Sequence, residues 1–114
     1  MNDEELLLVL QVINAVRERC GLDLLPEIPK GLRPDGEHDI GRSCPLARAI
    51  PRTVVAADYV RTPDRQTAEA LSSSFKHPVQ NFVEFPGEFV IDLPDSLAAF
   101  VACYDRCELP QFIE

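Results

Sequence analysis

Residues 3–20 constrain the fold most strongly, because they predict a helix with more apolar surface than one face can bury. Acidic residues stand in its first turn, arginines in its last turn, and Gly21 follows as a stop. Leu7, Leu8 and Val12 widen the apolar surface beyond a single stripe. The helix therefore either lies at the centre of the core or shares a face with a second copy of the chain. The apolar residues at helical spacing are Leu6, Val9, Leu10, Ile13 and Val16.

The segment from Leu25 to Arg42 predicts a long irregular arm. It carries three prolines and three glycines and shows neither a helical nor a strand period. Loops of this length in small domains often carry function, although an arm that packs across the surface is the alternative. The candidate interaction surface combines this arm with the first helix. Its residues are Leu7, Leu8, Val12, Arg33, Asp35, His38 and Asp39.

Residues 43–114 predict an αβ core. β-branched residues without a breaker predict one strand over Thr53–Arg61. Alternation on both sides of Pro86-Gly87 predicts a hairpin of Val79–Phe85 with Glu88–Leu93. The fold class is therefore α+β, a small three-stranded antiparallel or mixed sheet packed against about four helices. No repeat or linker divides the chain, so we expect residues 1–114 to form a single domain.

The helices of this core are predicted from capping residues and apolar spacing. Besides the first helix, helical segments are expected over Ser43–Pro51, Thr62–Phe75 and Pro94–Cys107. Phe112 and Ile113 are expected to fix the tail that follows. The expected core positions are Leu46, Ala49, Ile50, Ala68, Leu71, Phe75, Leu97, Phe100, Val101 and Tyr104.

The charge of the chain limits its partners. The 114 residues carry a formal net charge of -8, which opposes binding to nucleic acid. Residues 30–65 differ, with seven basic and five acidic side chains, so a local basic patch is the alternative to a solvated surface. The acidic N-terminus does not resemble a secretory signal, and its apolar stretch is too short to span a membrane. We therefore expect a cytoplasmic protein with reduced thiols. The arginines of the basic patch are Arg33, Arg42, Arg48 and Arg52.

Cysteine chemistry provides two further hypotheses. Cys44 stands at a predicted helix N-terminus, where the helix dipole favours a thiolate, and His38 and Asp39 lie upstream as partners for acyl transfer. Cys103 and Cys107 share a face of the last predicted helix and could offer two thiolates to zinc. The alternative is that these thiols are buried and inert. We favour that alternative and assign no catalytic residue, cofactor or metal.

The sequence PDGEHD at residues 34–39 could bind a metal, but the spacing of acids in an EF-hand is absent, and a polar turn is the alternative. The chain contains no phosphate-binding glycine loop, dinucleotide fingerprint, HExxH or GxSxG motif. Motifs therefore assign no activity.

Residues 44–112 carry a pattern of short motifs. It begins with Cys44-Pro45-Leu46-Ala47-Arg48-Ala49-Ile50 and, after a strand, continues with Leu93-Pro94, Phe100-Val101, Tyr104-Asp105, Pro110 and Phe112. The pattern resembles small proteins of actinobacteria and their phages that have no assigned activity. The resemblance implies the layout of the core and a phage or mobile-element setting, and it implies no catalytic residue.

The leading hypothesis is a non-enzymatic protein that acts through protein-protein contact, as a homodimer or with a host protein. In the setting that the resemblance implies, it is an accessory or regulatory factor of a phage or mobile element. A virion or assembly component is the second hypothesis. A small thiol- or metal-dependent enzyme that uses Cys44 and His38 is the third.

Overall fold

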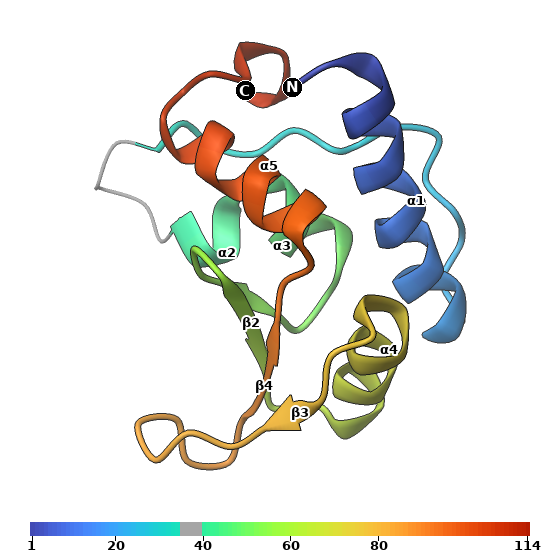
Figure 1. Cartoon of the computed structure of the whole chain (residues 1–114), viewed down its shortest axis with the longest axis vertical. Helices are drawn as coiled ribbons and strands as arrows, with labels where there is room; N and C mark the ends of the chain where they lie inside the picture. The colour runs from blue at the N-terminus through green and yellow to red at the C-terminus, as the bar shows by residue number, and fades with distance from the viewer. Residues whose placement is uncertain (35–39) are drawn as a thin grey trace.

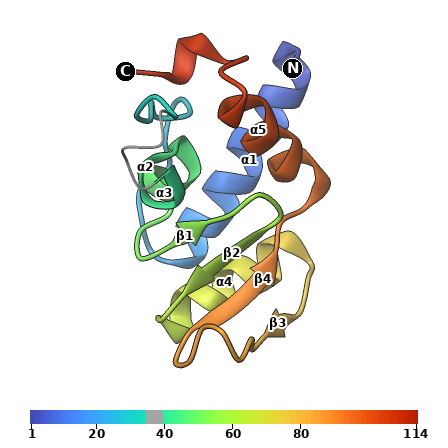
Figure 2. The same cartoon turned by 90° about the vertical axis from the view of Figure 1, so that its left-hand side faces the viewer.

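The fold is built on an antiparallel sheet of four short strands. The computed structural model describes residues 1–34 and 40–114. The strand order is β1-β2-β4-β3, and α4 lies behind the sheet in Figure 2. The α+β class predicted from the sequence is confirmed. The elements in Figure 1 are α1 (Asp3–Arg19), α2 (Ile40–Ser43), α3 (Pro45–Ala49), β1 (Val54–Val55), β2 (Tyr59–Thr62), α4 (Arg65–Phe75), β3 (Val79–Gln80), β4 (Phe89–Asp92), α5 (Asp95–Asp105) and a 3-10 turn at Pro110–Phe112.

The sheet has four strands where three were expected, because the stretch Thr53–Arg61 forms a hairpin. β1 and β2 pair antiparallel, and the Ala56 amide donates to the Tyr59 carbonyl at 2.8 Å across the turn. Aspartate is favoured in turns, and Asp58 lies in this one. The two alanines before it continue the apolar run, so the sequence reads as one uninterrupted strand.

The predicted hairpin of Val79–Phe85 with Glu88–Leu93 forms with a shorter first strand. β3 pairs antiparallel with β4, and Val79 stands opposite Ile91. The chain then leaves the sheet and makes turns, in one of which the Phe85 amide donates to the Phe82 carbonyl at 3.1 Å. The ring centroids of Phe82 and Phe85 lie 6.0 and 6.1 Å from that of Tyr59. The alternating aromatics that predicted a strand up to Phe85 therefore pack back against β2.

The core lies between the sheet and the helices. Val60 of β2 stands opposite Ile91 of β4, and both are buried. The ten core positions predicted for the last three helical segments are all buried. The helical spacing of apolar residues thus identified the inward faces of α3, α4 and α5 correctly.

α1 forms as predicted and packs against α4 and α5. Asn2 and Glu5 make reciprocal hydrogen bonds at its start, where the Glu5 amide donates to Asn2 Oδ1 at 2.8 Å. Val12 is half-buried and packs against the core, as do Leu6 and Leu10. Most of the wide apolar surface is therefore covered within the chain. Among the described residues, no helix is long and apolar enough to cross a bilayer.

Two polar side chains of α1 hold irregular backbone, Asn14 at the start of the arm and Arg17 in the segments before and after the arm. Asn14 Nδ2 donates to the Leu25 carbonyl at 3.0 Å, and Asn14 Oδ1 accepts from the Leu25 amide at 2.8 Å. Arg17 donates to the carbonyls of Asp23 and Ala49, at 2.7 Å in each case. These side chains satisfy backbone groups that have no partner in a helix or strand. Over residues 25–34 the arm is irregular as predicted, and its last residues belong to α2.

Further along, Gly31 of the arm lies against the C-terminal tail. We call this contact the crossing. The Gly31 amide donates to the Phe112 carbonyl at 2.7 Å, and the Glu114 amide donates to the Gly31 carbonyl at 2.9 Å. A Cβ atom on Gly31 would lie 2.6 Å from both the Ser43 carbonyl oxygen and the Tyr104 hydroxyl. Only glycine fits this crossing without a shift of the backbone around it. The predicted fixing of the tail is confirmed by these bonds.

We predict that Gly31→Ala lowers the free energy of unfolding by about 1–3 kcal/mol, because the added methyl group overpacks the crossing. Urea unfolding followed by circular dichroism measures the change. Ser73→Ala on the exposed side of α4 is the control and is expected to change stability by less than about 0.5 kcal/mol. Equal stability of the two variants would contradict the tight crossing.

Candidate functional site

One candidate site is a cleft where the end of α1, the turn after α3 and the start of α4 meet. It has a volume of about 240 Å³. A thiol, a guanidinium, a carboxylate, an amide and a hydroxyl line it. Catalytic sites use groups of these types, so the chemistry open to the cleft depends on which of them are already hydrogen-bonded within the protein. The lining residues are Cys20, Leu22, Pro51, Arg52, Asp64, Gln66 and Thr67.

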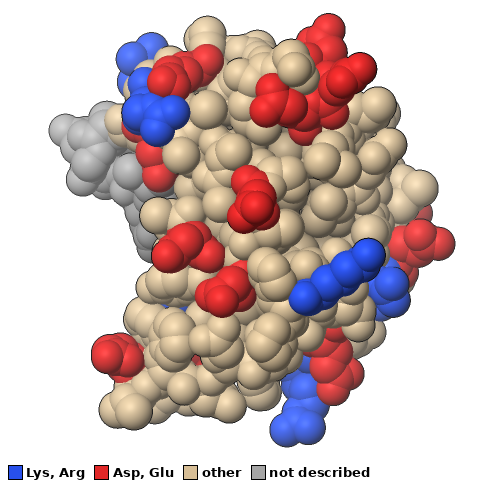
Figure 3. Space-filling model, viewed as in Figure 1, with Lys and Arg blue, Asp and Glu red and all other residues tan. Residues whose placement is uncertain are grey.

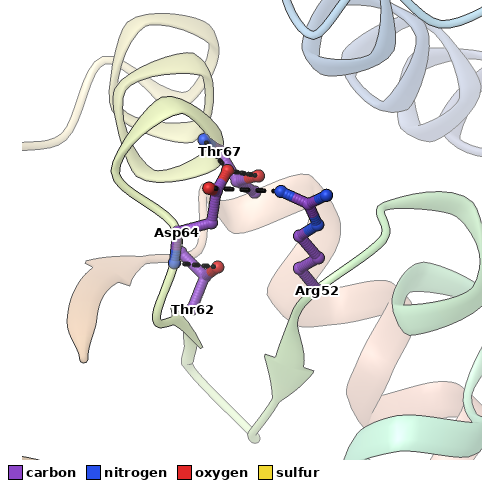
Figure 4. Close-up of polar contacts among 4 residues, drawn as sticks. All are labelled: Arg52, Thr62, Asp64 and Thr67. Carbon is purple, nitrogen blue, oxygen red and sulfur yellow. Dashed lines mark hydrogen bonds and ion pairs between the residues drawn. The ribbon is translucent and has the colours of Figure 1, made fainter. Parts of the chain in front are cut away.

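Asp64 lies at the centre of the polar contacts in this cleft (Figure 4). One carboxylate oxygen accepts from the Thr67 amide at 2.9 Å and from the Thr67 hydroxyl at 2.6 Å. The other faces Nη1 of Arg52 at 3.3 Å. The Asp64 amide donates to the Thr62 hydroxyl at 3.1 Å. Asp64 is therefore the N-cap of α4, and its carboxylate holds the start of the helix.

The charges in the cleft follow from this bonding. The Thr67 hydroxyl and amide lower the pKa of Asp64, and Arg52 lowers it further. Burial raises the pKa of the Cys20 thiol, and the negative charge of Asp64 raises it further. The carboxylate is thus charged and already bonded, while the thiol is protonated at neutral pH. The bonds in the cleft hold the start of α4 and join it to Arg52 in the turn after α3. The Asp64 carboxylate also occupies the position where the N-terminus of α4 would hold an external anion.

Cys44, the candidate nucleophile, is buried at the N-cap of α3. Burial raises the pKa of its thiol, and this effect exceeds the lowering by the backbone N–H groups of Ala47 and Leu46. The helix dipole that was expected to favour a thiolate is therefore outweighed by desolvation. The prediction of a small buried cysteine is confirmed. His38 and Asp39, its proposed partners, lie outside the described residues.

The two cysteines predicted to share a helical face differ in their surroundings. Cys103 lies within α5 and is half-buried, with Nη2 of Arg106 3.7 Å from its sulfur. Cys107 is exposed and lies beyond the C-cap of α5 in a left-handed backbone conformation. The favoured interpretation of a buried thiol is therefore wrong for Cys107, because the helix ends before this residue. Across residues 1–34 and 40–114, no three histidine, cysteine or acidic side chains form a group that could hold a metal ion. The acidic part of the PDGEHD sequence falls on the residues not described.

The predicted interaction residues divide into three groups. Leu7 and Leu8 are 55% and 48% exposed on the outer side of α1, and Arg33 is exposed on the arm. Val12, packed against the core, is only partly accessible. Asp35, like His38 and Asp39, lies outside the described residues. Leu7 and Leu8 therefore form the exposed apolar part of the predicted surface.

The predicted basic patch is partly neutralised by acidic neighbours. Arg48 pairs with Glu114, and Arg52 pairs with Asp64. Arg48 also donates to the Lys30 carbonyl at 2.9 Å, which fixes it to the arm. Two of the four arginines therefore have structural roles.

Sequence reasoning missed a surface at the edge of the sheet, which we name the β3-edge surface. It consists of Val79 and a groove of about 250 Å³ between β3 and α4, together with Val83 in the loop that follows β3. Val79 is 37% exposed and Val83 is 94% exposed. In Figure 3, uncharged atoms cover most of the lower left, where Figure 1 places the β3–β4 loop. The sequence carries one signal, since Glu84 is the only Asp, Glu, Lys or Arg among residues 77–87. The groove is lined by Arg65, Ala68, Glu69, Val79, Asn81 and Phe89.

Comparison of the chain with protein-family models, with curated proteins and with solved structures gave no match. The residues of this chain and their geometry are therefore the basis for its function.

We predict that Asp64→Ala lowers the Tm by on the order of 5 °C at neutral pH, because α4 loses its N-cap. The pKa of Asp64 is lowered in the folded state. Its stabilisation is therefore present above the ordinary carboxyl pKa and is lost as the pH falls through the folded value. Thermal unfolding across the acid range should show the gap between wild type and variant closing. A gap that widens in acid would contradict the capping role.

We predict that iodoacetamide at neutral pH modifies Cys107 in the native protein before it modifies Cys44. Cys107 is exposed, whereas Cys44 is buried and the pKa of its thiol is raised. Mass spectrometry of digested samples over time measures both sites, and urea-unfolded protein provides the control in which both react. Rapid modification of native Cys44 would support the thiol-enzyme hypothesis instead.

Proposed function

We propose that the protein is a protein-binding module whose β3-edge surface holds an extended segment of a partner protein. The observation that carries the proposal is the exposure of Val79 beside a partly apolar groove on an open sheet edge, with the exposed Val83 in the loop that follows β3. Exposed apolar surface with polar residues at its rim is typical of protein interaction sites.

The two edges of the sheet differ in their neighbours. β1 and β3 are the edge strands, and α2 and α3 pack against β1. β3 packs against β4 and α4, and Figure 2 shows its other side turned outward. An edge strand exposes backbone N–H and C=O groups that a further strand can pair with. The free edge thus supports binding by strand addition.

The groove beside this edge supplies a place for a side chain of the added strand. Val79, Ala68 and Phe89 give it an apolar lining. Arg65, whose guanidinium lies 5.8 Å from the centroid of the Phe89 ring, and Glu69 line it from α4. An aliphatic side chain suits the apolar lining, and charged neighbours of either sign can pair with Arg65 or Glu69.

The size of the surface favours a segment over a folded partner. Stable contacts between folded proteins bury about 800 Å² on each side and involve about 20–30 residues. β3 has two residues, and the groove has six lining residues. A short strand can use this area fully, because its affinity comes from backbone pairing and one or two side-chain pockets.

The biological setting of the proposal comes from the resemblance to actinobacterial and phage proteins. In that setting the chain is an accessory or regulatory factor of a phage or mobile element, and the partner segment belongs to a host protein. Recovery of the protein from purified particles by mass spectrometry would favour the virion alternative.

We predict that Val79→Asp and Val83→Asp each weaken capture of the partner from native host extract by about tenfold or more, because each places a charge in the apolar contact. Affinity capture with quantitative mass spectrometry measures the retained partner. The matched control is Leu24→Asp, which alters a leucine that is 59% exposed and follows α1. A partner that binds all four proteins equally would contradict the β3-edge surface.

A further inference from the structure

The outer side of α1 carries a second apolar surface, separate from the β3-edge surface. Two shallow hollows lie along this helix. The first, of about 400 Å³, is lined by Glu4, Glu5, Leu7, Leu8 and Gln11. The second, of about 330 Å³, is lined by Ala15, Glu18 and Arg19. A large leucine thus marks one end of the face and a small alanine the other.

Four of the residues that line the two hollows form one stripe along the helix. Glu4, Leu8, Gln11 and Ala15 are spaced by four, three and four positions, the spacing of a seam between two packed helices. Their side of α1 lies away from Val9, Ile13 and Val16, which face the core. The stripe is therefore available to a second helix.

We infer that α1 pairs with α1 of a second copy of the chain, antiparallel and across a two-fold axis that passes between Gln11 and Val12. This axis places Leu8 of each copy against Ala15 of the other. A leucine then enters the hollow that a small residue leaves, which is the packing of a knob into a hole. Because the axis is two-fold, every such contact occurs twice.

Charge complementarity selects the same arrangement. The axis that joins Leu8 to Ala15 also brings Glu4 opposite Arg19 of the other copy. Among the described residues, neither Glu4 nor Arg19 forms an ion pair within its own chain. A parallel pairing would instead place Glu4 against Glu4, which is repulsive. The antiparallel pairing therefore satisfies both the shapes and the charges of the face.

The area of contact makes this a weak dimer. One helix of 17 residues is about 25 Å long and cannot bury the 800 Å² or so that a stable interface needs. Each copy also carries a net charge of -8, so the copies repel at long range. Self-association is therefore expected with a dissociation constant of about 10 µM to 1 mM.

Sedimentation equilibrium at protein concentrations up to about 1 mM tests the pairing. The wild type should approach the mass of a dimer as its concentration rises, and Leu8→Glu should stay monomeric. Leu24→Ser, which changes an exposed leucine off the stripe, should associate like the wild type. A wild type that stays monomeric, or a Leu8→Glu variant that associates equally, would overturn the inference.

A charge exchange separates pairing from any loss of helix stability. Glu4→Arg and Arg19→Glu should each weaken association by about threefold to tenfold, and the double variant should recover the wild-type constant. Asp3→Arg changes a charge in the same helical turn but off the stripe, so it should have no such effect. Failure of the double variant to recover would overturn the antiparallel arrangement. The β3-edge variant Val79→Asp should associate like the wild type, so this test is independent of the proposed partner binding.

Discussion

The crossing of the arm and the tail at Gly31 is the contact that holds the C-terminal end of the chain against the arm. The Gly31 backbone bonds to Phe112 and Glu114 of the tail, and its α-carbon passes close to Ser43 and Tyr104. The Tyr104 hydroxyl donates to the arm as well, at the Leu32 carbonyl, and its burial raises the pKa of Tyr104 to about 12. The part of the arm around Gly31 and Leu32 is therefore packed into the folded structure.

This arrangement determines which surfaces are open to other molecules. The arm is anchored to Asn14, and Arg17 bonds the segments before and after the arm, so that side of α1 is covered from within the chain. The side with Leu7 and Leu8 stays exposed, and so does the sheet edge at β3. In the cleft at α4, Asp64 is bonded to Thr67 and Arg52. We therefore propose that the cleft stabilises the fold and that the two apolar surfaces make contacts with other molecules.

Sequence patterns predicted the elements that follow a regular period. The helices were found because residues such as Leu71 and Phe100 recur on one face, and the core positions followed from them. The turn at Asp58 was missed because the two alanines before this residue continue the apolar composition of the strand. For Cys44 the sequence left a thiolate open beside the favoured buried thiol, because desolvation depends on tertiary burial, which spacing does not reveal. The β3-edge surface could not be found, since strand order decides which strand lies at an edge.

Native-state hydrogen exchange tests most directly whether the arm belongs to the core. The amides of Gly31 and Glu114 donate to backbone carbonyls across the crossing, at 2.7 and 2.9 Å. We expect both amides to exchange only through opening of the whole domain, as slowly as the amide of Val90 in β4. Rapid exchange at Gly31 and Glu114, with Val90 still protected, would show that the arm and tail open on their own and would contradict the account.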